Sequence, residues 1–333
     1  MGGFFLQEKI FQIFLFSERP PMKKNNRKTR AAAFSALAAA FALTVLLIFE
    51  QFGIISQTVQ PLSSEEAQLV QSFREADLSV CVFNIGQADS ILVKQGEAVM
   101  LIDCGEADDA GQILENLEKL GVSRIDTLVL THPHADHIGG AQEILESVSV
   151  GTIYMPAVSA STVTFERLMD CILENEIDAA AASAGMEIPL GGCSLHVLSP
   201  AQDFYSDNLN EYSIVLLLEY NGIKMLFTGD AEQENEDMIL TSGENIDCDF
   251  VKIGHHGSAT SSTQAFIDAC SADWAVATTQ YNSPHGLPKE EILTRWKDSG
   301  AAVLCTHQYG DIYAFVLDGS FAVFTSQQPV SNS

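Results

Sequence analysis

Basic residues are scarce in this chain, which has 17 Lys and Arg against 44 Asp and Glu and a formal net charge of −27 at pH 7. Residues 1–50 hold seven of the basic groups, so residues 51–333 carry 10 basic and 41 acidic groups, a net of −31. Lys and Arg supply most of a protein's affinity for nucleic acid, because they neutralise phosphates. The composition therefore disfavours long nucleic acid as a partner without excluding it, and it is equally typical of a merely soluble surface.

Paired cysteines are also absent. The seven cysteines are odd in number and scattered singly, with no CxxC pair. This spacing excludes a zinc knuckle or a dithiol redox motif. We interpret the cysteines as small buried apolar residues. Outside the cytoplasm a disulfide is an alternative, but the spacing selects no pair.

Long uncharged stretches are limited to AAAFSALAAAFALTVLLIF (31–49), whose nineteen residues match the ~20 that a membrane-spanning helix needs. The basic segment KKNNRKTR before it places residues 1–30 in the cytoplasm by the positive-inside rule. No small-x-small cleavage site follows, which favours an uncleaved signal anchor over a removed signal peptide. We expect a single-pass protein of the cell membrane with an extracellular domain, a linker over 50–77, and Met22 as an alternative start.

Short β-branched runs alternate with amphipathic stretches after the linker. We predict strands over 78–83, 90–94, 99–102, 127–130, 194–198, 213–220, 224–227, 250–253, 274–277, 302–306 and 311–316. We predict helices over 110–120, 140–145, 164–174, 232–240, 263–270 and 289–298. This order indicates an α/β domain over 78–320, with two facing sheets and helices outside them, followed by a tail over 321–333.

The strongest motif is LVLTHPHADHIGG (128–140), in which an apolar strand ends in three histidines and one aspartate. Residues two apart in an extended segment share a face, so His132 and His134 can bind one metal ion. Asp136 and His137, beyond a bend, can reach a second ion. Imidazole and carboxylate are ligands for zinc, manganese or iron, and two-metal hydrolases hold ions about 3.5 to 4 Å apart.

Three further histidines and one aspartate occur in similar contexts. His255 and His256 follow an apolar strand in VKIGHHGS, His285 lies in NSPHGLP, and Asp230 ends the strand of LFTGD. Adjacent residues of an extended chain face opposite ways, so one of His255 and His256 should face the metals, and we favour His256. Asp230 suits a ligand that bridges two ions.

Together these segments resemble the metallo-β-lactamase superfamily, on LIDCG (101–105), the HxHxDH run and Asp230. Within it the chain is most similar to the ComEC-like competence hydrolases, on NIGQADS (84–90), NEYSIV (210–215), FTGD (227–230) and GHHGS (254–258). The resemblance covers residues 80 to about 317. It implies a four-layer αβ/βα sandwich with two divalent metal ions, zinc or manganese, at one edge.

The resemblance also implies roles for individual residues. His132 and His134 bind the first ion, Asp136, His137 and His285 bind the second, and Asp230 bridges them. Groups that support the ligands are Asp103, Asp89, Asn210 and Ser213. Asp103 can equally be a turn-capping residue, and for Asp89 the role of turn former is favoured. Groups that take part in catalysis are Asp136, His255, His256 and Ser258, with a histidine donating to the scissile group.

Two departures from the family pattern affect the prediction. The usual mid-chain third histidine is missing, and residues 208–213 stand in its place; His196 is a less favoured substitute because Leu195 and Val197 flank it like an ordinary strand residue. The multi-span channel of the full competence proteins is also missing, so we expect only the hydrolase part.

The resulting hypothesis is an extracytoplasmic phosphodiesterase or nuclease-like enzyme, acting on a small or polymeric phosphodiester and attached to the membrane by its N-terminal helix. The alternatives are a non-catalytic metal-bearing binding module and a hydrolase of another ester, such as a choline phosphodiester or a lactone. β-Lactam hydrolysis fits less well, because that branch lacks GHHGS. The sequence indicates no oligomeric state.

Overall fold

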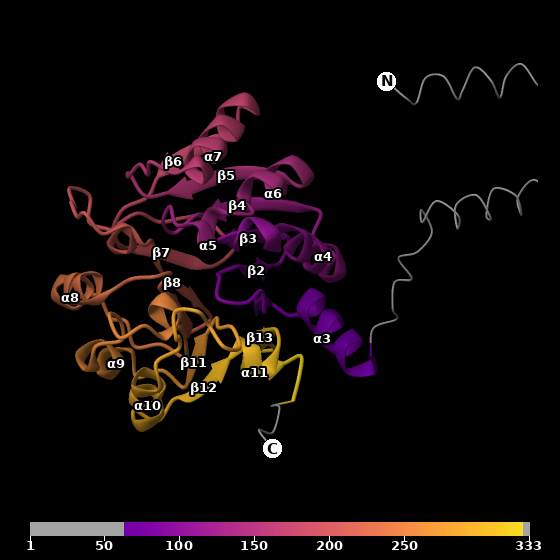
Figure 1. The fold of residues 1–333 in the computed structure, drawn as a ribbon. Helices are drawn as coiled ribbons and strands as arrows, with labels where there is room; N and C mark the ends of the chain where they lie inside the picture. The colour runs from indigo at the N-terminus through magenta and orange to yellow at the C-terminus, as the bar shows by residue number, and fades with distance from the viewer. Residues whose placement is uncertain (1–62, 329–333) are drawn as a thin grey trace, which may run out of the picture. The chain divides into compact units, whose positions relative to one another are not determined.

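The computed structural model describes residues 63–328, which fold around two β-sheets (Figure 1). The first sheet has eight strands in the order β14-β13-β1-β2-β3-β4-β5-β6. Their bounds are β1 (Leu78–Val82), β2 (Ile91–Gln95), β3 (Ala98–Ile102), β4 (Arg124–Val129), β5 (Ser149–Met155), β6 (Asp178–Ala181), β13 (Ile312–Leu317) and β14 (Ser320–Thr325). β1 is antiparallel to β2 and β13, whereas β3 to β6 run parallel to one another.

The second sheet has six strands in the order β12-β11-β10-β9-β8-β7. Their bounds are β7 (Ser194–Ser199), β8 (Val215–Tyr220), β9 (Ile223–Phe227), β10 (Phe250–Lys252), β11 (Trp274–Ala277) and β12 (Ala302–Cys305). β9 to β12 are parallel, and β8 is antiparallel to both β7 and β9. Parallel strands end at the same edge of a sheet, so the loops after β9, β10 and β11 lie together.

Helices cover the outer face of each sheet. Their bounds are α3 (Ser64–Glu75), α4 (Ala110–Leu120), α5 (Ala135–Ile138), α6 (Ala141–Ser147), α7 (Val163–Glu174), α8 (Gln233–Ser242), α9 (Gln264–Cys270), α10 (Glu290–Asp298) and α11 (Thr306–Tyr309), with 3₁₀ turns η1 (Ala107–Asp109), η2 (Leu209–Tyr212) and η3 (Gly254–Gly257). In Figure 1, α4, α6 and α7 lie on one side of the stacked sheets and α8, α9 and α10 on the other. The predicted α/β arrangement of two sheets with helices is confirmed.

Three hydrophobic clusters separate these layers. One lies between the two sheets, one beneath α3 to α7, and one beneath α8 to α10. Strand β1 shows how the sequence produces this: Val80 and Val82 pack between the sheets, whereas Cys81 packs under the helices. Alternate residues of a strand face opposite sides, so a strand buried on both faces is apolar throughout.

Helix α4 illustrates how the outer layers attach. Ile113, Leu117 and Leu120 recur at three- and four-residue intervals and are fully buried against the first sheet. The helix ends at Gly121, whose φ of 79° is left-handed and whose N–H bonds the carbonyl of Leu117. On the opposite side, Trp296 of α10 is completely buried.

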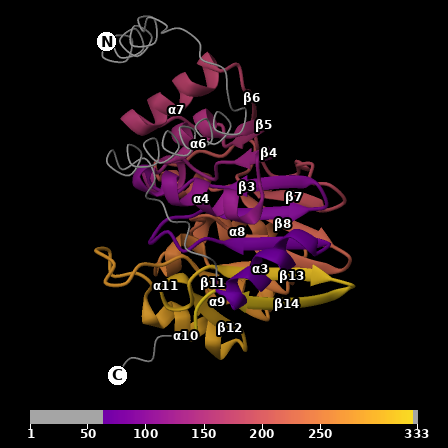
Figure 2. The ribbon, with the colours of Figure 1, turned by 90° about the vertical axis from the view of Figure 1, so that its right-hand side faces the viewer.

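Two segments differ from the sequence prediction at the ends of the domain. Residues 64–75, within the expected linker, form α3, which buries Phe73 completely and lies against β1 and β13 (Figure 2). Residues 320–325, within the expected tail, form β14 at the edge of the first sheet. Both elements are only partly buried, so their few apolar residues gave weak periodicity.

Strands β5 and β6 were not predicted either. Only Ile153 of β5 is buried, and β6 is a run of Asp and Ala with no buried residue. Parallel pairing with β4 positions these strands, since the register of β4 continues through β5 into β6. Their own residues carry little strand signal.

The cysteine interpretation agrees with the structure. All seven cysteines lie within residues 63–328, none forms a disulfide there, and six are buried. Among the same residues, no helix has the length and apolar character that a membrane crossing requires. The predicted signal anchor at 31–49 and the segments before it lie outside the described residues.

Candidate metal centre

The predicted metal residues gather where strands of both sheets end. The HxHxDH loop follows β4 of the first sheet, and Asp103 follows β3 beside it. From the second sheet, Asp230 follows β9, and His255 and His256 follow β10. Ligand sites of α/β proteins form at the carboxyl ends of parallel strands, where loops bring side chains together, and here two such edges face each other.

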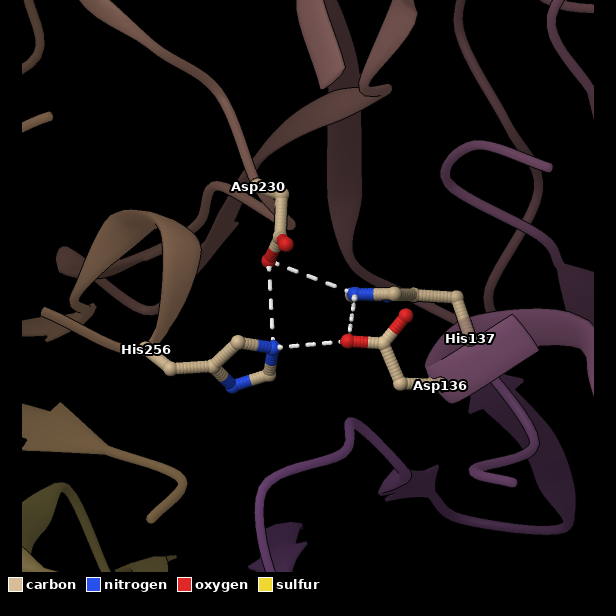
Figure 3. Close-up of side chains that lie close together, drawn as sticks. All are labelled: Asp136, His137, Asp230 and His256. Atoms are coloured by element: carbon tan, nitrogen blue, oxygen red, sulfur yellow. Dashed lines mark ion pairs between the residues drawn. The ribbon is translucent and has the colours of Figure 1, made fainter. Parts of the chain in front are cut away.

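Four side chains form one compact group, drawn in Figure 3: Asp136, His137, Asp230 and His256. One ligand atom from each lies within 4.8 Å of all the others. His256 Nε2 is 3.3 Å from Asp136 Oδ2 and 3.6 Å from Asp230 Oδ1. His137 Nε2 is 3.3 Å from the same Asp230 oxygen and 3.9 Å from Asp136 Oδ2. Two imidazole nitrogens and two carboxylate oxygens therefore surround one point.

Hydrogen bonding tests whether this group suits a cation. Six buried polar side-chain atoms of the described residues have no hydrogen-bond partner, and three of them are His137 Nε2, Asp230 Oδ1 and His256 Nε2. Buried polar atoms are almost always paired, because an unpaired one costs the free energy of its lost hydration. Imidazole and carboxylate atoms that face each other without protons between them fit a divalent cation.

A hydrogen-bond network fixes the orientation of His137. Its Nδ1 is 2.7 Å from Asp103 Oδ2, and the same carboxylate accepts hydrogen bonds from the backbone N–H and the hydroxyl of Thr131, each 2.7 Å long. The carboxylate can only accept, so His137 carries its proton on Nδ1 and presents the Nε2 lone pair to the group. Asp103 is fully buried and has a φ of 61°, a strained conformation that this network maintains.

Thr278 fixes the orientation of His256 in the same way. The Nδ1 of His256 lies 2.9 Å from the Thr278 hydroxyl and 3.1 Å from its carbonyl oxygen, so Nδ1 donates and Nε2 faces the group. Thr278 in turn donates to Asp89, which is ion-paired with the buried Lys252 at 2.9 Å. Burial alone would raise the pKa of Asp89, but the Lys252 ammonium together with His256 and His137 outweighs it and keeps the pKa low. Thr278 carries no motif that sequence reasoning could have used.

His132 and His134 form a second pair beside the group. His132 Nε2 and His134 Nδ1 are 2.9 Å apart, and the rings of His132 and His137 are 4.1 Å apart. Ser213 Oγ lies 3.4 Å from His132 Nδ1 and accepts a hydrogen bond from the Asp230 backbone N–H at 3.1 Å. The three histidines and the one aspartate of the HxHxDH run thus face one region of the molecule.

His255 points away from its neighbour. Its Nε2 is 3.7 Å from Asp230 Oδ2, and its Nδ1 is held 3.0 Å from Glu232 Oε1 at the rim of the site. Burial opposes ionisation of Glu232, but hydrogen bonds from His255, Asn210 and Thr260 lower its pKa to about 2. Both His255 and His256 have positive φ, 45° and 51°, so the pair is not extended as the prediction assumed. Glu232 lies two residues beyond Asp230 in the sequence. Its contact with His255 forms only in the folded chain, so sequence spacing could not predict it.

His285 does not join the group. It is exposed and lines a shallow depression with Gln87, Ser258 and Lys289, beside Asp136, His255 and His256. In the structure His256 lies next to Asp136 and His137, as the sequence analysis favoured, and the ligand role of His285 stays a prediction. The turn at 255–257 brings His256 inward, and the loop that carries His285 stays on the surface. His196 is half-exposed and bonds Ser194 on β7.

Comparison with known proteins agrees with this site. Residues 84–170 match the family described as the Metallo-beta-lactamase superfamily. The chain is 31% identical over 193 residues to ComE operon protein 3 of Bacillus subtilis, covering 58% of this chain and 25% of that protein. It is 29% identical over 283 residues to competence protein ComA of Neisseria gonorrhoeae, covering 84% of this chain and 38% of that protein.

A solved structure, the diiron β-hydroxylase CmlA of Streptomyces venezuelae, shares the fold with a TM-score of 0.50 at 13% identity, covering 72% of this chain and 54% of that one. The described domain is a metallo-β-lactamase domain. Its relatives among the competence proteins are consistent with the ComEC-like kind of that domain. The chain spans a quarter and about two-fifths of the length of the two competence relatives, respectively.

Proposed function

We propose that this chain is a metal-dependent phosphodiesterase that uses two divalent ions, zinc or manganese. The observation that carries the proposal is the group of three buried, unpaired atoms, His137 Nε2, Asp230 Oδ1 and His256 Nε2. Membership of the metallo-β-lactamase superfamily supports hydrolysis, and the fold family binds divalent metals. The resemblance to the ComEC-like competence hydrolases favours phosphodiester hydrolysis.

The side chains divide into two ligand sets that share Asp230. His132 and His134 would hold the first ion, and Asp136, His137 and His256 the second. Bound ions of this kind supply a nucleophile near neutral pH and stabilise the negative charge that develops on the substrate. Asp103 and Thr278 keep the Nε2 lone pairs of His137 and His256 available, because each accepts a hydrogen bond from the Nδ1–H of its histidine.

His255 is placed to donate a proton from Nε2. Burial lowers its pKa, but the hydrogen bond from Nδ1 to Glu232 and the nearby Asp230 outweigh this, so its pKa is raised from the ordinary histidine value. Its Nε2 faces the depression beside Asp136. A protonated Nε2 there can donate to a non-bridging phosphate oxygen or to the leaving group.

The wall of the depression indicates the substrate. Lys289 supplies a cation, and Gln87, Ser258 and His285 supply hydrogen-bonding groups around Asp136. A single phosphodiester group fits this arrangement. The net charge of −31 over residues 51–333 favours small or zwitterionic phosphodiesters, such as a choline phosphodiester, over long nucleic acid. We place the reaction outside the cell, with the membrane contact at residues 31–49.

The test is hydrolysis of bis(p-nitrophenyl) phosphate by the purified chain, measured together with its content of zinc and manganese. We expect metal-dependent turnover that is lost in His137→Ala and retained in His196→Ala, a matched histidine on β7 away from the group. Bound metal without turnover on any phosphodiester would favour the non-catalytic binding module. Turnover that survives His137→Ala would contradict the proposal.

A further inference from the structure

We infer that the side-chain oxygen of Asn210 is a ligand of the first metal site beside His132, His134 and the shared Asp230, in the place where the superfamily commonly uses a third histidine. This inference rests on the proposed function, because it concerns the ion that His132 and His134 would hold. These two residues supply two nitrogen atoms and the shared Asp230 supplies an oxygen, so the nitrogen that a third histidine would supply is missing from this set.

The orientation of the Asn210 amide is determined by its neighbour. Its Nδ2 lies 3.0 Å from Glu232 Oε1, and a carboxylate oxygen can only accept a hydrogen bond. Asn208 Nδ2 donates to the other oxygen of Glu232 at 2.7 Å. The amide nitrogen of Asn210 therefore faces Glu232, and its oxygen must face the opposite way.

The oxygen that results from this orientation has no partner. Asn210 is 7% exposed, and its Oδ1 is one of the six buried side-chain atoms of the described residues without a hydrogen bond. Three of the other five are the atoms of the metal group. A buried acceptor without a donor is costly, and a cation removes that cost as a hydrogen bond would.

The turn that carries Asn210 lies beside the residues of the first metal site. Asn210 lies in η2, and Ser213 at the end of the same turn contacts both His132 Nδ1 and the Asp230 backbone. One short turn thus carries both Asn210 and the Ser213 that contacts His132 and Asp230.

An amide oxygen ligand changes which metal ion the site prefers. Carbonyl and carboxylate oxygens suit manganese and magnesium, whereas a third imidazole favours zinc. We therefore expect the first site to discriminate less strongly between zinc and manganese than a site with three histidines would, and Asn210→His to shift it toward zinc.

The experiment measures Zn²⁺ and Mn²⁺ binding to the purified full chain by competition with a chromophoric chelator, with metal content as a second readout. His256→Ala leaves only the first site, and His134→Ala leaves only the second, so each ion is assigned. Variants are Asn210→Ala and Asn210→His, each in both backgrounds. Asn208→Ala is the matched control, since Asn208 bonds the same carboxylate from the same turn. Circular dichroism of the metal-free proteins checks folding.

We expect two ions per wild-type chain. Asn210→Ala should weaken Zn²⁺ binding by at least about tenfold in the His256→Ala background and leave it unchanged in the His134→Ala background. Asn210→His should restore or exceed wild-type Zn²⁺ affinity and lower Mn²⁺ affinity relative to zinc, and Asn208→Ala should match the wild type.

Unchanged first-site affinity in Asn210→Ala, equal loss in Asn208→Ala, or a single ion in the wild-type chain would each overturn the inference while leaving a metal hydrolase in place. A wild-type chain that binds no metal would instead refute the proposed function.

Discussion

The buried ion pair of Asp89 and Lys252 should contribute strongly to the stability of the fold, and this contribution should depend on both partners being present. Lys252 is fully buried, and its Nζ has two neighbours, Asp89 Oδ2 at 2.9 Å and the Ile253 carbonyl oxygen at 3.1 Å. Asp89→Asn keeps the shape of the side chain and removes its charge. The ammonium then stays in the interior with neutral acceptors only and no counter-charge.

Breaking a buried pair in this way costs about 3 to 5 kcal/mol in the free energy of unfolding. For a domain of this size each kcal/mol lowers the melting temperature by about 2 to 4 °C, so the expected decrease is about 6 to 20 °C. Replacing both partners, as Asp89→Asn with Lys252→Met, removes the uncompensated charge. The double variant should lie within about 1 kcal/mol of the wild type or above it.

The assay is chemical denaturation of the purified chain in chelator, so that metal binding does not contribute, for the wild type, the two single variants and the double variant. A coupling energy of several kcal/mol between the two sites is expected from this cycle. If Asp89→Asn alone unfolds with a free energy within about 1 kcal/mol of the wild type, Lys252 is not held by its counter-charge, and the argument is wrong.

Three further outcomes are expected. His285→Ala should leave the number of bound metal ions unchanged, measured by metal analysis, because His285 lies outside the group of Asp136, His137, Asp230 and His256; loss of an ion would restore its predicted ligand role. Lys289→Ala should raise KM for bis(p-nitrophenyl) phosphate about fivefold with little change in kcat, since an exposed ion pair contributes about 1 kcal/mol; an unchanged KM would remove Lys289 from the substrate wall. Trp296→Ala should lower the free energy of unfolding by about 3 to 5 kcal/mol without altering metal content, as judged by denaturation, because a fully buried indole is lost far from the site; a loss below about 1 kcal/mol would show that the core there repacks.

The sequence predicted most of what depends on local pattern. Buried strands such as β1 and β9 and amphipathic helices such as α4 carry periodicity that any reader of the sequence can see. The HxHxDH run identified the metal centre because its residues follow one strand and bend once. Each of these features is contained in fewer than fifteen consecutive residues.

What the sequence did not predict depends on contacts between distant segments. Thr278 and Glu232 are ordinary residues until folding places them 2.9 Å and 3.0 Å from His256 and His255. The preference for His256 over His255 agrees with the group in the structure, but the alternation rule behind it assumes an extended chain, and η3 is a left-handed turn there. β14 and α3 were assigned to the tail and linker because partial burial weakens their pattern.

The compact group of Figure 3 draws two residues from each half of the sandwich. Asp136 and His137 belong to the first sheet, and Asp230 and His256 to the second, so an ion held by all four joins the halves at their edge as a non-covalent clasp. The site can form only after the two sheets have docked. Any affinity for metal is then also a measure of that docking, and a change in the packing between the sheets, far from every ligand, should appear as a change in metal affinity.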